Sequence, residues 1–140
     1  MFYGVFANLT KDKNAEFSSG VVSLIKKLGQ DAEVFTEVSA ISEKRYGAVI
    51  PIGGDGTVLS VATVCVKCKI PLFPINLGTL GYLASAERGN YEAAVTALVK
   101  GEVVKDGRCY LHIEQNGEDN AALNEVVVGR GQPSKLLKTR

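Results

Sequence analysis

The sequence predicts an α/β protein: a doubly wound, mostly parallel sheet, followed by a β-hairpin. Up to Gly101, short apolar runs alternate with segments whose apolar residues recur at helical spacing. Residues 47–52, "GAVIPI", are apolar throughout, which is typical of a central parallel strand covered on both faces. After Gly101, two longer strand-like segments flank a cluster of turn residues, which favours an antiparallel hairpin.

The N-terminal third of the chain contains four expected elements. Residues 2–8 combine aromatic and β-branched side chains, as a first strand does. Residues 14–28 keep the apolar spacing of a helix, and Gly29 supplies its stop. A second strand is expected at residues 32–37, and a short helix or turn at residues 41–46.

The middle of the chain continues the alternation. The buried strand at 47–52 is followed by an expected helix at 58–68 and a strand at 71–76. A further helix is expected at 91–100, with Gly101 at its end.

The last part of the chain predicts two strands, at 103–117 and 120–131, joined by turn residues 116–119. The final ten residues lead to no further element, so the chain is expected to be part of a longer protein. We therefore expect an α/β domain over residues 1–101 and the start of a second part, with a different architecture, over residues 102–140.

Composition excludes several classes of protein. The 140 residues are 46% hydrophobic, and 16 Lys and Arg balance 15 Asp and Glu, so no basic excess suggests a nucleic-acid or membrane surface. No apolar stretch approaches the roughly 18 residues that span a bilayer, and the first residues lack the features of a signal peptide. Three cysteines, an odd number, favour a reducing compartment, and we expect a cytoplasmic protein.

A glycine-rich turn, Gly53-Gly54-Asp55-Gly56-Thr57, directly follows the buried strand. One interpretation is structural: glycine permits positive φ, and Asp55 or Thr57 caps the next helix. The other is a phosphate site, because open α/β sheets bind ligands at the carboxyl ends of their strands. Glycines leave backbone N–H groups accessible to an anion, and the next helix offers its positive end.

Asp55 needs its own explanation, because a carboxylate repels phosphate. It fits a phosphate site if it accepts a proton from an attacking hydroxyl or orients a metal ion. Neither the P-loop motif nor the dinucleotide fingerprint G-x-G-x-x-G occurs in the sequence.

A second glycine-rich loop, "NLGTLGYL", ends the next predicted strand. Gly78 and Gly81 are explained by a turn alone, but two such loops at one sheet edge form a crevice. Asn76 and Tyr82 would give it amide and aromatic groups suited to a nucleotide. Farther along, Asn124 and Glu125 are adjacent at the start of a predicted strand. Such a pair can bind adenine edges and ribose hydroxyls, although alone it is more often an ordinary polar strand end.

Together these segments resemble the NAD kinase family. Its signature order G-G-D-G-T, N-x-G-x-x-G-[FY]-L and A-L-N-E matches residues 53–57, 76–83 and 122–125. The first motif alone is weak, because diacylglycerol and sphingosine kinases and phosphofructokinases carry similar turns. The second and third narrow the choice, and the G-T-G-N-D-like loop of lipid kinases is absent.

The resemblance implies phosphorylation of the adenosine-ribose 2′-hydroxyl of NAD by ATP with Mg²⁺, giving NADP, with Asp55 as general base. Relatives are homo-oligomers, so self-association is expected. The residues that the resemblance places at the nucleotides are Gly53, Gly54, Gly56, Thr57, Asn76, Gly78, Tyr82, Asn124, Glu125 and Lys135.

The chain departs from the family in two respects. Ser60 stands where many relatives have a basic residue. Relatives also continue into an all-β domain that completes the NAD site. The resemblance therefore implies that the hairpin leads to an all-β domain missing from the chain, with residues 102–140 as its truncated start. This chain alone is expected to bind NAD weakly and turn over poorly. A lipid or sugar kinase sharing the G-G-D-G-T turn, or a non-catalytic nucleotide-binding module, remains an alternative.

The cysteines and the single histidine form text patterns typical of zinc sites, Cys65-x-x-Cys68 and Cys109-x-x-His112. We expect no zinc or redox chemistry, because residues three apart in a strand face opposite ways. Cys65 and Cys68 would lie late in a helix, where nothing activates a thiolate.

Overall fold

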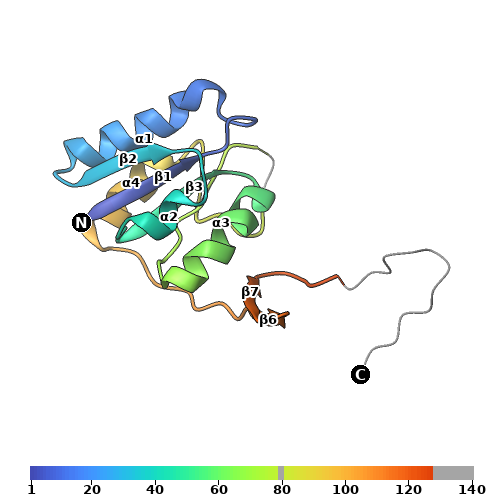
Figure 1. The fold of residues 1–140 in the computed structure, drawn as a ribbon. Helices are drawn as coiled ribbons and strands as arrows, with labels where there is room; N and C mark the ends of the chain where they lie inside the picture. Colours follow the sequence, from blue (N-terminus) through green and yellow to red (C-terminus); the bar gives the residue numbers. More distant parts are fainter. Residues whose placement is uncertain (79–80, 128–140) are drawn as a thin grey trace.

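The computed structural model describes residues 1–78 and 81–127. Its strands are β1 (Phe2–Ala7), β2 (Asp31–Phe35), β3 (Ala48–Gly53), β4 (Ile75–Asn76), β5 (Ala86–Glu87), β6 (Leu111–Gln115) and β7 (Glu118–Ala122). Its helices are η1 (Lys13–Ala15), α1 (Glu16–Lys27), α2 (Ala40–Glu43), α3 (Asp55–Cys68) and α4 (Tyr91–Lys100). The first five strands form one parallel sheet in the order β2-β1-β3-β4-β5, and β6 and β7 form an antiparallel hairpin (Figure 1).

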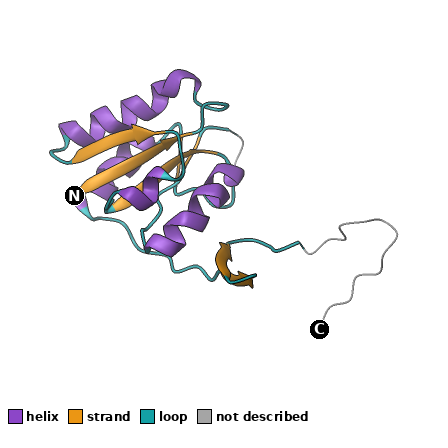
Figure 2. Ribbon diagram, viewed as in Figure 1, coloured by secondary structure: helices purple, strands orange, loops and turns teal. Residues whose placement is uncertain are grey.

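Helices cover both faces of the parallel sheet (Figure 2). On one face, α1 and α4 bury Val21, Ile25 and Val95 against the strands. On the other face, α3 buries Val61 and Cys65 with residues of β1 and β3. This three-layer arrangement explains why β3 is apolar along its whole length, and it confirms the predicted doubly wound α/β fold.

The structure corrects the predicted start of one helix and the extent of one strand, and it adds a strand that was not predicted. Helix α3 begins at Asp55, three residues before the predicted start, so Asp55, Gly56 and Thr57 of the glycine turn lie in the first turn of the helix. The strand predicted at 71–76 pairs fully only as β4, because Pro71 and Pro74 have no N–H to donate to a ladder. The two-residue edge strand β5 was not predicted, since so short a segment has no periodicity.

Helix termini are fixed by local hydrogen bonds. The buried Asp12 carboxylate accepts the backbone N–H groups of Phe17 and Ser18 at 2.9 Å each, which satisfies the first turn of α1. Gly29 and Gly101 adopt positive φ just after α1 and α4, as predicted. Lys69 has the same left-handed conformation after α3, with φ of 54°.

The hairpin is shorter than predicted. Its two-residue turn, Asn116-Gly117, has positive φ at both positions, so Glu118 and Asp119 belong to β7 and not to the turn. Residues 103–110 form no strand, and Cys109 therefore lies before β6. The hairpin lies against α3, where the Lys67 ammonium is 3.4 Å from the Asn120 side-chain oxygen.

Within the described ranges, no helix is long and apolar enough to cross a membrane. The domain boundary expected at residue 101 stays a prediction.

Candidate active site at the carboxyl edge of the sheet

The glycine turn lies beside the switch point of the sheet, where the order in which the strands are added reverses. From β1 the chain crosses to β2 on one side and later returns to β3 on the other. Open α/β sheets bind ligands in the crevice outside such a switch point. Gly53 at the end of β3 is also in register with Asn76 at the end of β4, so the two predicted glycine loops leave the sheet at one level.

The glycines of the turn are not there to provide positive φ. Among the described residues, the glycines with positive φ are Gly29, Gly101 and Gly117. Asp55 and Thr57 do not cap α3 either, because the N-cap is Gly54 and no side chain caps it. Both parts of the purely structural interpretation therefore fail here.

Gly53 has a packing role. A Cβ atom at this position would collide with the Thr57 side chain, lying 2.8 Å from its Cβ. Thr57 is 7% exposed, and its hydroxyl accepts a hydrogen bond of 2.8 Å from the Asn8 amide. This bond joins the end of β1 to the first turn of α3 across the switch point.

Asn8 is a site residue that the sequence interpretation missed. Its side-chain oxygen accepts hydrogen bonds from the Thr10 backbone N–H at 3.1 Å and from the Thr10 hydroxyl at 2.7 Å. The available signal was its position, directly after the first strand and at the same edge as the glycine turn.

Gly54 and Gly56 leave open space instead. A Cβ atom at either position would meet nothing within 4 Å. The Thr57 N–H already bonds to the Gly54 carbonyl at 2.9 Å, whereas the N–H groups of Asp55 and Gly56 precede the first helical hydrogen bonds. The helix dipole places positive potential at this end of α3. These features are those of an anion-binding surface, and the predicted phosphate site here stays a prediction.

Asp55 contacts the second glycine loop directly. Its Oδ2 accepts the Tyr82 backbone N–H at 3.1 Å, and its Oδ1 accepts the Leu83 N–H at 3.3 Å. Gly81 makes this approach possible, because a Cβ atom there would lie 2.5 Å from Oδ1 of Asp55. The predicted meeting of the two loops is thus present, with the half-buried carboxylate at their junction.

The other predicted residues of the second loop have different surroundings. Asn76 is 3% exposed, and its side-chain oxygen accepts the Gly78 N–H at 3.0 Å, which shapes the start of the loop. The Tyr82 ring is 95% exposed. It is available to a ligand, but its backbone already binds Asp55.

Asn124 and Glu125 do not join this site in the described chain. They were expected at the start of a strand, but β7 ends at Ala122 and both residues follow it, exposed to solvent. Figure 1 shows this segment leading away from the α/β layers. The strand assignment was wrong because the residues around Asn124 carry no alternation beyond β7. Lys135 lies outside the described residues.

The cysteines show no feature of a reactive site. Burial, with a smaller contribution from the neighbouring Cys68, raises the pKa of the Cys65 thiol to about 12, so the thiol stays protonated. His112 lies in β6 and contacts Asp119 at 3.0 Å, while Cys109 precedes the strand. In the part of the chain that is described, no group of three or more His, Cys, Asp or Glu residues could hold a metal ion.

The sequence that forms this candidate site matches a known protein-family model. The model described as "ATP-NAD kinase N-terminal domain" matches residues 5–103, which include both glycine loops. The chain belongs to the NAD kinase family. This membership selects among the kinases that share a G-G-D-G-T turn and disfavours a lipid or sugar kinase.

Individual NAD kinases agree with the family assignment. The NAD kinase of Clostridium kluyveri is 30% identical over 144 residues, covering 96% of this chain and 51% of that protein. The NAD kinase of Pyrococcus abyssi is 32% identical, covering 100% of this chain and 55% of that protein. The chain thus spans about half the length of the curated relatives it matches.

A solved NAD kinase structure shares the fold. The crystal structure of an NAD kinase from Archaeoglobus fulgidus in complex with ATP matches with a TM-score of 0.58 and 22% identity. The match covers 80% of this chain and 41% of the other.

Proposed function

We propose that the protein containing this chain is an NAD kinase that transfers the γ-phosphoryl group of ATP to the 2′-hydroxyl of the adenosine ribose of NAD. One observation carries the proposal. Asp55 is the carboxylate at the junction of two glycine loops, beside an open helix N-terminus, where a phosphate and a hydroxyl can meet. The family membership supplies the class of substrate.

In this mechanism the open face at Gly54 and Gly56 binds phosphate oxygens through the first N–H groups of α3. The 2′-oxygen of NAD attacks the γ-phosphorus, and the bond from that phosphorus to the β–γ bridging oxygen breaks, releasing ADP. Asp55 accepts the proton of the attacking hydroxyl. The two backbone N–H donors of the second loop hold its carboxylate in place for this step.

Mg²⁺ would enter as part of the MgATP substrate. Magnesium is commonly held by one or two carboxylates together with substrate phosphates. A single carboxylate next to a phosphate-binding turn fits this pattern without a dedicated protein cage. The ion would neutralise the charge of the phosphates.

Several parts of the proposal concern residues other than Asp55. Tyr82 is proposed to contact the adenine, and Asn124, Glu125 and Lys135 to contact the dinucleotide once the remainder of the protein is in place. An all-β second domain, homo-oligomeric assembly and a cytoplasmic location complete the proposal.

The test is NADP formation by the intact protein from NAD and MgATP, compared with Asp55→Asn. Asparagine keeps the size of the side chain but accepts no proton, so we expect the rate to fall by roughly 10²-fold or more, with NAD affinity retained. NAD binding without any NADP formation by the unaltered protein would favour a non-catalytic module. Phosphorylation of a lipid or a sugar phosphate, with none of NAD, would contradict the proposal.

A further inference from the structure

The first turn of α3 depends on other parts of the chain for support. Its N-cap is Gly54, which has no side chain, and no side-chain hydrogen bond caps the helix. By comparison, the carboxylate of Asp12 satisfies the first turn of α1. Because α3 begins at Asp55, the turn that carries the proposed base has no cap of its own.

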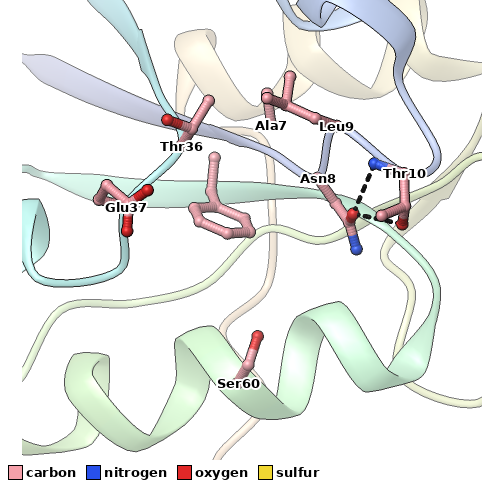
Figure 3. Close-up of a pocket in the computed structure, with 8 residues that line it drawn as sticks. Ala7, Asn8, Leu9, Thr10, Thr36, Glu37 and Ser60 are labelled. Atoms are coloured by element: carbon pink, nitrogen blue, oxygen red, sulfur yellow. Dashed lines mark hydrogen bonds between the residues drawn. The ribbon is translucent and has the colours of Figure 1, made fainter.

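Asn8 reaches this turn from the end of β1. Its Nδ2 donates a hydrogen bond of 2.8 Å to the hydroxyl oxygen of Thr57, which is buried. Thr10 fixes the amide in this orientation, because its backbone N–H and its hydroxyl bind the amide oxygen at 3.1 and 2.7 Å (Figure 3). A backbone N–H can only donate, so the oxygen of Asn8 faces Thr10 and the NH₂ group faces Thr57.

Asp55 is consequently attached at two points. Its carboxylate accepts the N–H groups of Tyr82 and Leu83 in the second loop, at 3.1 and 3.3 Å. Its backbone lies in the same helical turn as Thr57, which Asn8 ties to β1. The two attachments come from opposite sides, because β1 and β4 flank β3 in the sheet. Loss of either one lets the carboxylate move relative to the second loop.

We propose that Asn8 is a positioning residue for Asp55. By binding Thr57, it holds the first turn of α3 so that the carboxylate keeps its place against the second loop. The inference rests on the proposed function, in which Asp55 accepts the proton of the attacking hydroxyl. A displacement of about 1 Å in such a geometry can cost roughly 100-fold in rate, so a single bond behind the base affects the reaction. Asn8 acts through Thr57 and takes part in no chemical step.

The kinetic test compares Asn8→Ala with Asn90→Ala in the intact protein. Asn90 is the matched control, because its amide oxygen also accepts a nearby backbone N–H, from Glu87 at 2.8 Å, at the start of another helix. We expect Asn8→Ala to lower kcat for NADP formation roughly tenfold, with the KM values for NAD and ATP within about twofold. The control is expected to leave all three constants unchanged. An unchanged kcat in Asn8→Ala, or a change confined to KM, would overturn the inference.

Two double variants test whether Asn8 acts through Thr57 and Asp55. In protein that already carries Asp55→Asn, Asn8→Ala should lower the residual rate less than about twofold, since no base is left to position. In a Thr57→Val background, which lacks the accepting hydroxyl, Asn8→Ala should cost nothing further. A full tenfold loss in either background would show that Asn8 acts by another route and contradict the proposal.

Amide hydrogen exchange, followed by NMR in the intact protein, decides the matter even if no NADP forms. The N–H groups of Tyr82 and Leu83 report on the carboxylate directly, because they donate to it. We expect Asn8→Ala to speed their exchange roughly tenfold, with exchange in β1 and β3 unchanged. That result supports the positioning role whether or not the proposed activity stands. Unchanged exchange at both residues refutes it, and so does equal acceleration throughout the sheet, which would indicate a general loss of stability.

Discussion

Gly53 and Gly81 make room for two close contacts in the proposed active site. Gly53 lets the Thr57 side chain fold back onto β3, and Gly81 lets the second loop reach the Asp55 carboxylate. Neither glycine has positive φ. Glycine is required at these two positions because a methyl group would collide with a neighbouring side chain. Alanine at either position therefore tests packing and not backbone freedom.

Gly81→Ala is expected to displace the loop from Asp55, because the new methyl would lie 2.5 Å from a carboxylate oxygen. Loss of two N–H donors leaves the base poorly oriented, and kcat should fall roughly 10- to 100-fold. Steady-state kinetics of NADP formation by the intact protein measure this effect.

Gly89→Ala is the matched control for that variant, because its Cβ would meet nothing within 4 Å and its φ is not positive. We expect its kinetics and thermal unfolding to match those of the unaltered protein. Unchanged kcat in Gly81→Ala would show that the bonds from Tyr82 and Leu83 do not position Asp55.

The sequence allowed the site to be predicted at the level of motifs but not of contacts. The position of Asp55 in a glycine turn directly after a buried strand followed from the sequence alone. The Asn8–Thr57 bond did not, because it joins residues 49 apart in sequence. Such a pair becomes visible only once strand order brings the ends of β1 and β3 together.

At the scale of elements, the three longer helices end in the same way but with different residues. After α1, α3 and α4, a left-handed residue allows the next N–H to bond back into the last turn. Gln30, Ile70 and Glu102 donate these bonds at 3.2, 2.9 and 2.9 Å. Glycine occupies the left-handed position after α1 and α4, but Lys69 occupies it after α3, with an unfavourable Cβ contact.

Lys69→Gly should therefore raise the free energy of unfolding by about 1 kcal/mol, less the entropy that glycine adds to the unfolded chain. Gly101→Ala is the reciprocal variant and should lower it by a similar amount. Urea denaturation measures both changes. A lower stability of Lys69→Gly would mean that the lysine side chain contributes more than its backbone costs.

The predictions of helices and strands succeeded where a periodic apolar pattern was long. They failed where hydrogen bonding to a neighbouring strand determined how far a strand extends. The helices at α1 and α4 followed from apolar spacing and terminal glycines. The fourth strand was overestimated because its prolines look apolar in sequence yet cannot donate to a ladder. The early start of α3 was missed because glycine and aspartate are poor helix formers in general but suit a first turn.

At the scale of the whole molecule, the strand order accounts for the location of the site. Returning from β2 across β1 to β3 brings the Asn8 loop and the glycine turn together at the switch point, where open α/β sheets bind their ligands. The hairpin lies on α3 and directs the chain away from this edge (Figure 1). The α/β fold was predictable because it follows from alternation along the chain, whereas the path after β7 carries no such pattern.

The central claim is that this site delivers a phosphoryl group to one ribose hydroxyl of NAD. The most direct measurement is phosphorus NMR of the product formed by the intact protein from NAD and MgATP. The account predicts a new monoester at the 2′-position of the adenosine ribose, formed at a rate that Asp55→Asn greatly reduces. A phosphate at another hydroxyl, or undiminished formation of the 2′-ester by Asp55→Asn, would contradict it.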